Sequence, residues 1–112
     1  MSGFGFDISD DIRQNGTMVL LRRPSPQGLH FDLPVMAMVR AYQPAELVGG
    51  IEQGDRRVVI SNAEIASRQW PGPPKRGDEI IISDRTTTLR VDATTLRVGG
   101  FVVKHVMQVR GS

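Results

Sequence analysis

The chain has 112 residues, no cysteine, and 14 basic against 12 acidic side chains. This length fits one domain that buries enough surface to fold alone, and the absence of cysteine excludes a disulfide framework and a thiolate metal site. The N-terminus has no basic start followed by an apolar run, and no apolar stretch is long enough for a membrane helix. We therefore expect a soluble protein that is intracellular or released by lysis. The net charge of +2 is too small to predict DNA binding.

Residues 1–15 predict a flexible N-terminal arm, and residues 16–112 predict a single domain. Two glycines and three aspartates surround isolated apolar residues in the arm. Phe4 and Phe6 are candidates for docking on a partner. The alternative is a frayed chain end without a binding role.

The loop between the first two predicted strands is long for a compact domain, and long loops are often functional. Thr17–Arg23 and Val35–Tyr42 predict the strands, and the prolines and glycine of "PSPQG" break the pattern between them. The apolar residues of "LHFDLP" have no evident partner strand, so we expect them to be half-exposed in the monomer and buried after assembly. The predicted contact residues are Leu29, His30, Phe31 and Leu33, with Arg22 and Arg23 beside them to pair with acidic groups of a neighbour.

One turn occurs twice in the middle of the chain. "GDRRVVIS", from Gly54, and "GDEIIIS", from Gly77, each place Gly-Asp before a β-branched run that ends in serine. Glycine suits a tight turn, and aspartate can hydrogen-bond the local backbone. Adhesion ligands display the tripeptide found at Arg76-Gly77-Asp78, but the repeated context favours a strand-entry turn in this chain.

A short helix is predicted between the two copies of this turn. Asn62–Gln69 fits one or two helical turns, with Ile65 facing inward. Trp70 follows, and we expect it in the core or at its rim. The next segment, "PGPP", forbids both helix and strand.

The last third of the chain contains the echo "TTLRVDA" and "TTLRVGG". We predict a strand over Thr87–Asp92, a connecting segment over Ala93–Gly100 and a final strand over Phe101–Arg110. Alternation along the final strand predicts a core-facing set: Phe101, Val103, His105, Met107 and Val109. The predicted fold is mainly β, a small antiparallel barrel or sandwich of five to six strands with one short helix.

No grouping of side chains predicts catalysis. His30 and His105 are far apart in sequence and lack local metal-ligand spacing. The strand-entry context already explains Asp55 and Asp78, and the chain has neither a nucleophile elbow nor a phosphate-cradling glycine loop. We expect no enzymatic activity, no cofactor and no metal. The arginine pairs lack interleaved aromatic residues of the kind that stack bases.

The order of several short motifs carries a family resemblance over Val35–Gly111. A proline-bounded loop and "RGDEIIIS" precede "TTLRV", and the last strand ends in "MQVRG". Upstream, "LVGGIEQGDRRVVISNAEIA" adds a middle region. This pattern resembles the small head–tail joining proteins of tailed bacteriophages, which are also called head-closure, stopper or neck proteins.

The resemblance implies a β-barrel monomer that assembles into a ring between the portal of the filled head and the tail, where it seals packaged DNA. Portal or adaptor proteins and tail proteins would be its partners. The virion neck, and the bacterial host cytoplasm before assembly, would be its locations. The rival hypotheses are a tail-terminator or other tail-assembly component, a small nucleic-acid-binding barrel and, less favoured, a small enzyme.

Overall fold

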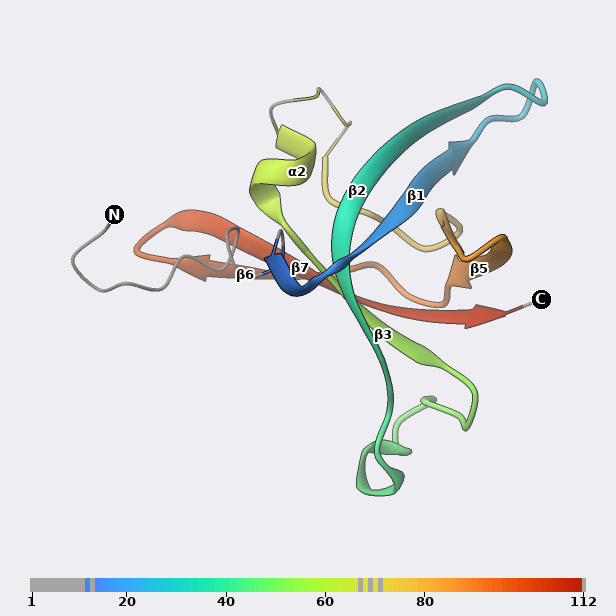
Figure 1. The fold of residues 1–112 in the computed structure, drawn as a ribbon, viewed down its shortest axis with the longest axis vertical. Helices are drawn as coiled ribbons and strands as arrows, with labels where there is room; N and C mark the ends of the chain where they lie inside the picture. Colours follow the sequence, from blue (N-terminus) through green and yellow to red (C-terminus); the bar gives the residue numbers. More distant parts are fainter. Residues whose placement is uncertain (1–11, 13, 67, 69, 71, 112) are drawn as a thin grey trace.

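The computed structural model shows strands that wrap around one core as an antiparallel barrel (Figure 1). It describes residues 12, 14–66, 68, 70 and 72–111. Most of the predicted arm, with Phe4 and Phe6, lies outside these residues. The prediction of a mainly β fold with a short helix is confirmed.

Six strands close the barrel, in the order β3-β2-β1-β4-β5-β7, because β3 also pairs with β7. Closure leaves these strands without the long free edges that an open sheet would present. The additional strand, β6, pairs with β7 outside this ring. In the described part of the chain the strands are β1 (Thr17–Pro24), β2 (His30–Ala41), β3 (Arg56–Ser61), β4 (Glu79–Ile82), β5 (Arg85–Leu89), β6 (Thr94–Val98) and β7 (Phe101–Gly111).

The helical elements are short. The helix α2 spans Asn62–Ala66 and begins at the predicted residue, and Ile65 is buried as expected. A 3-10 turn, η1, covers Pro44–Glu46 in the connection between β2 and β3. Trp70 follows α2 and is also buried, which confirms its expected place in the core.

Alternate residues of the strands face the barrel interior, as the period of a β-strand requires. On β7, His105, Met107 and Val109 are buried. Phe101, which was predicted to face the core, is 78% exposed. The pairing of β7 with β3 ends at Lys104, so the barrel wall does not cover the first residues of β7. The core consists of Val19, Leu21, Leu33, Val35, Ala37, Val58, Ile60, Ile65, Trp70, Ile80, Leu89, Met107 and Val109.

Two segments predicted as loops are strands. The predicted loop 24–34 is wrong from His30 onward, because β2 begins at that residue. The pairing of β2 with β1 runs from His30 opposite Pro24 to Ala37 opposite Thr17. Pro34 is tolerated because β2 pairs with β3 only from Met38, which leaves an edge free for a residue without an N–H. The predicted connection Ala93–Gly100 is also wrong, because it contains β6 and its turn.

The two Gly-Asp turns are confirmed as strand-entry turns. Gly54 and Gly77 have φ values of 99° and 94°, a region open to glycine. The Asp55 carboxylate accepts a hydrogen bond of 3.0 Å from the backbone N–H of Glu52. Asp78 accepts one of 2.9 Å from the N–H of Lys75. Each aspartate therefore accepts a hydrogen bond from the backbone three residues earlier and so closes the turn that leads into its strand.

Each of these buried aspartates also binds an arginine from a distant strand. Arg110 of β7 donates to both oxygens of Asp55, at 2.7 and 3.0 Å. Arg23 of β1 donates to both oxygens of Asp78, at 3.0 and 2.7 Å. Bidentate pairs of this kind add geometric specificity to their energy. The two aspartates thus bind different arginines, and they do not come together as a pair of carboxylates in one site.

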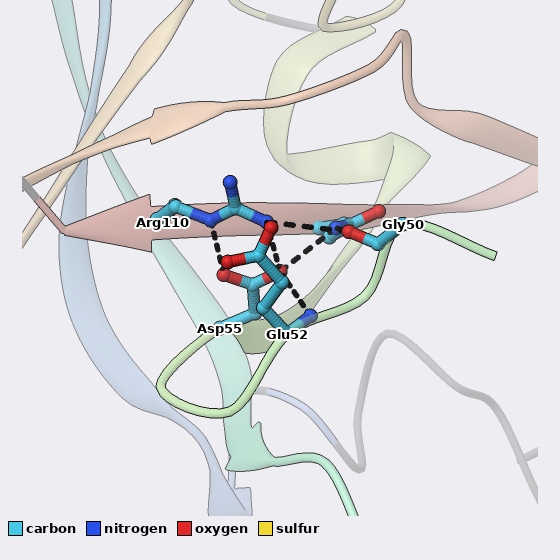
Figure 2. Close-up of polar contacts among 5 residues, drawn as sticks. Gly50, Glu52, Asp55 and Arg110 are labelled. Atoms are coloured by element: carbon cyan, nitrogen blue, oxygen red, sulfur yellow. Dashed lines mark hydrogen bonds and ion pairs between the residues drawn. The ribbon is translucent and has the colours of Figure 1, made fainter. Parts of the chain in front are cut away.

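Figure 2 shows Arg110 facing the carboxylate of Asp55, with Gly50 and Glu52 beside them. Arg110 also donates to the carbonyl of Gly50 at 3.2 Å, and Gln108 donates to Asp55 at 2.9 Å. The Arg110 hydrogen bonds, followed by those from Glu52 and Gln108, lower the pKa of Asp55 to about 2. This network ties the connection before β3 to the end of β7.

Replacing Asp55 by alanine is expected to lower the free energy of unfolding by about 2–3 kcal/mol, because it removes one partner of a buried ion pair. Urea denaturation followed by circular dichroism measures this loss. Glu52→Gln is the matched control, since Glu52 lies 3.4 Å from Arg110 but its side chain is 68% exposed. A much smaller loss is expected for the control, and equal losses would contradict the role given to Asp55.

The same carboxylate predicts a loss of stability in acid. The pKa of Asp55 falls from an ordinary 3.8 to about 2 on folding, so the unfolded chain binds the proton more readily. Its contribution is present above the unfolded pKa and disappears between about pH 5 and pH 2. Urea midpoints measured across this range should therefore fall more steeply for the unmodified protein than for Asp55→Asn. Parallel curves would show that another group causes the acid dependence.

Candidate interaction surfaces

The hairpin of β1 and β2 projects beyond the barrel, toward the upper right of Figure 1. It carries all of the predicted interface residues except Phe4 and Phe6, which belong to the N-terminal arm. The register places Leu21 opposite Leu33, Arg23 opposite Phe31 and Pro24 opposite His30. Since alternate residues share a face, the predicted residues divide between the two sides of the hairpin.

The inner side of the hairpin joins the core. Leu33 is 7% exposed and packs in the core, so its expected half-exposure in the monomer is wrong. The reason is its register, which sets it across from the fully buried Leu21. Leu33 therefore stabilises the monomer and offers no free surface to a partner.

Further out on this side, an aromatic pair supports the hairpin. Phe31 is 40% exposed, and its ring centroid lies 5.2 Å from that of Trp70. The guanidinium of Arg23 lies 4.9 Å from the same indole centroid while it binds Asp78. Such cation–π and ring contacts hold the projecting strands against the barrel. Leu29, at the turn, is 73% exposed, more than either Phe31 or Leu33 on the same hairpin.

The outer side of the hairpin has a charged cluster. Arg22 donates to both oxygens of Asp32, at 2.8 and 2.9 Å, and His30 Nδ1 lies 2.8 Å from Asp32 Oδ1. The Arg22 hydrogen bonds lower the pKa of Asp32. Both Arg22 and Arg23 thus bind a carboxylate of their own chain, and their pairing with a neighbour stays a prediction.

A second exposed surface lies on the hairpin of β6 and β7, which extends to the left in Figure 1. Its large exposed apolar side chains are Leu96, Val98 and Phe101, which are 43%, 61% and 78% exposed. Gly99 and Gly100 form its turn, with φ values of 58° and 84°. A Gly-Gly pair between two strand-like runs is a recognised hairpin signal, so the sequence contained the information that the predicted connecting segment missed.

One edge of β6 is not covered by any strand of the described residues. Among the described strands, β6 pairs with β7 and with no other. A free edge with exposed apolar side chains is a template for another strand. The hairpin therefore combines two features that favour association with another chain.

The two histidines lie in different places. The charged cluster contains His30, whose side chain is 45% exposed. His105 is buried, with Nε2 3.0 Å from the Asn62 amide oxygen and Nδ1 3.1 Å from the Thr95 hydroxyl. Burial lowers the pKa of His105, which favours the neutral ring. His105 therefore faces the core, as the alternation along the final strand predicts.

Neither local chemistry nor comparison with known proteins assigns an activity. The described residues contain no group of three histidine, cysteine or acidic side chains that could hold a metal ion. Within the same part of the chain, no helix is long and apolar enough to cross a membrane. Searches of protein-family models and of curated proteins found no significant match.

Two leucines of one hairpin provide a matched test of these surfaces. Leu33→Ala is expected to lower the free energy of unfolding by about 2–4 kcal/mol, because it opens a cavity in the core. Leu29→Ala removes the same atoms from an exposed turn and should change it by less than about 0.5 kcal/mol. Chemical denaturation of both variants measures the difference. Similar losses would mean that Leu29 is covered in solution.

Proposed function

We propose that this protein is a structural component of a tailed bacteriophage or prophage particle that joins the head to the tail. Several copies would form a ring on the portal, contact the tail and seal the packaged DNA. Two lines of reasoning support the proposal: the resemblance over Val35–Gly111 and the exposed surfaces of the barrel. The role requires no catalysis, cofactor or metal.

The observation that carries the proposal is the presence of two different exposed apolar hairpins on one small barrel (Figure 1). Leu29 and Phe31 lie on the first, and Val98 and Phe101 on the second. Exposed apolar surface marks sites of association. In a ring of identical subunits, each subunit uses two different surfaces, one for each neighbour. Such contacts form a closed ring when the rotation between neighbouring subunits divides a full turn evenly.

The barrel provides a rigid frame for both surfaces. The ion pair of Arg23 and Asp78 and the contact of Phe31 with Trp70 hold the β1–β2 hairpin. The β6–β7 hairpin is formed by β6 and the first half of β7. Near the other end of β7, the ion pair of Arg110 with Asp55 attaches this strand to the turn before β3. Rigid protein surfaces dock with small backbone changes. The monomer would therefore enter the neck ring largely as folded, from the host cytoplasm.

A tail-terminator ring would use the same two surfaces. The particle with which the protein travels separates these roles, because a head-closure protein purifies with filled heads and a terminator purifies with tails. A small nucleic-acid-binding barrel is the other alternative, and salt-dependent retention of DNA by the free monomer would favour it.

Complementation of a gene deletion in the parent phage or prophage tests the connector role. Electron microscopy of the deletion lysate should show free tails beside heads that are empty or leaking DNA. Leu29→Asp or Phe101→Asp should fail to restore joined particles, since each places a charge in a proposed apolar contact. Val48→Asp is the control, because Val48 is 67% exposed but lies outside both hairpins.

The outcomes are distinct. Normal joined particles in the deletion lysate would remove the connector proposal. Restoration by both hairpin variants would show that these surfaces are not the contacts. Thermal unfolding of each purified variant should match that of the unmodified protein, which separates loss of contact from loss of fold.

A further inference from the structure

A cleft of about 830 Å³ lies at one mouth of the barrel. The end of β2, the start of β3 and the turn between β4 and β5 line it, together with Gly111 of β7. Mouths of β-barrels are preferred places for ligands, and this volume lies in the usual range for ligand pockets.

Strand alternation directs two arginines toward this mouth. Val58 is fully buried on β3, and Arg56, two residues earlier, is on the same inward-facing row. On β5, Thr87 is buried, and Arg85 precedes it by two residues. Both arginines line the cleft and are exposed. The interior rows of two separate strands therefore end in guanidinium groups at one opening.

The charges at the mouth remain partly uncompensated. Arg56 and Arg85 form no ion pair or side-chain hydrogen bond with the described residues. Arg40 also lines the cleft, but it binds both oxygens of Glu46 at 2.8 Å. Asp84 contributes one acidic group to the lining. Two open arginines thus face a single carboxylate.

The turn that carries Asp84 is conformationally unusual. Ser83 and Asp84 have φ values of 48° and 67°, and they connect Ile82 to Arg85 as a two-residue hairpin turn. Such turns need a positive φ at both central positions, which aspartate tolerates better than serine. The turn places the hydroxyl of Ser83 and the carboxylate of Asp84 among the groups that line the cleft. Backbone strain of this kind is concentrated at ligand sites and turns.

We propose that the barrel mouth binds a phosphate group, with Arg56 and Arg85 as its main ligands. The planar guanidinium pairs with phosphate oxygens in a bidentate fork. Two inward-facing arginines match the charge of one phosphate better than that of a single carboxylate. The phosphate comes from either a nucleotide or a nucleic-acid backbone. This inference is independent of the connector proposal, so either can fail alone.

Titration followed by amide and arginine side-chain NMR signals tests the site in the full chain. The probes are pyrophosphate, a nucleoside monophosphate and 12-nucleotide single- and double-stranded DNA at low salt. Signals of the cleft residues should shift first. Arg56→Gln and Arg85→Gln should each weaken binding about tenfold, as expected for loss of a charge-assisted hydrogen bond. Arg56→Lys should weaken it less, because it keeps the charge but loses the fork.

Two further variants control for charge. Arg97→Gln removes the same charge from the exposed β6 strand, away from the mouth, and should leave binding within twofold. Asp84→Asn should strengthen binding, because it removes the repelling carboxylate, and asparagine tolerates a positive φ. Thermal unfolding confirms that each variant is folded.

The titrations distinguish a nucleotide from a nucleic-acid backbone as the source of the phosphate, and they can also refute the proposed site. Tighter binding of DNA, with affinity that falls steeply with salt, would support a backbone phosphate. Binding of the small probes without DNA binding would support a nucleotide. Either result confirms the site if both glutamine variants weaken it. The proposal is overturned if no probe shifts the cleft signals, or if Arg97→Gln weakens binding as much as Arg56→Gln does.

Discussion

The buried carboxylate of Asp55 is the constraint on which the barrel depends. It is 2% exposed and satisfies a backbone N–H of its own turn as well as two side chains of β7. Because β3 must meet β7 for the barrel to close, this carboxylate joins the two strands at the seam. A buried charge is tolerated only when it is fully paired, so the turn, the seam and Arg110 form one structural unit.

A second buried aspartate makes the same kind of contacts where the β1–β2 hairpin leaves the barrel. Asp78 closes the turn before β4 and binds Arg23, whose guanidinium also covers Trp70. The hairpin is therefore positioned by a polar contact that is itself buried against an aromatic ring. This explains how a projecting hairpin with exposed Leu29 can have a defined orientation. Both hairpins and the barrel mouth are then surfaces of one frame.

The repeated pentapeptide "TTLRV" shows how strongly context determines burial. In its first copy, Thr87 and Leu89 are buried and pair with the last residues of β7. In its second copy, Leu96 and Val98 are exposed, and the strand pairs with the first half of β7. The local preference for a strand is the same in both copies. The difference is that the first copy lies in the closed ring, paired with β4 on one side and β7 on the other, whereas the second lies outside that ring.

The sequence by itself determined the strand-forming segments near Thr17–Arg23 and Phe101–Arg110, the Gly-Asp turns and the mainly β class, since these follow from alternation and turn chemistry over a few residues. It also indicated the exposed Leu29 but misplaced Leu33 and Phe101, because exposure depends on which strand lies opposite. Only the tertiary structure decided the closure of β3 on β7, the arginine partner of each aspartate and the placement of Arg56 and Arg85 at one cleft. These are contacts between residues far apart in the chain, and no local pattern specifies which distant strands meet.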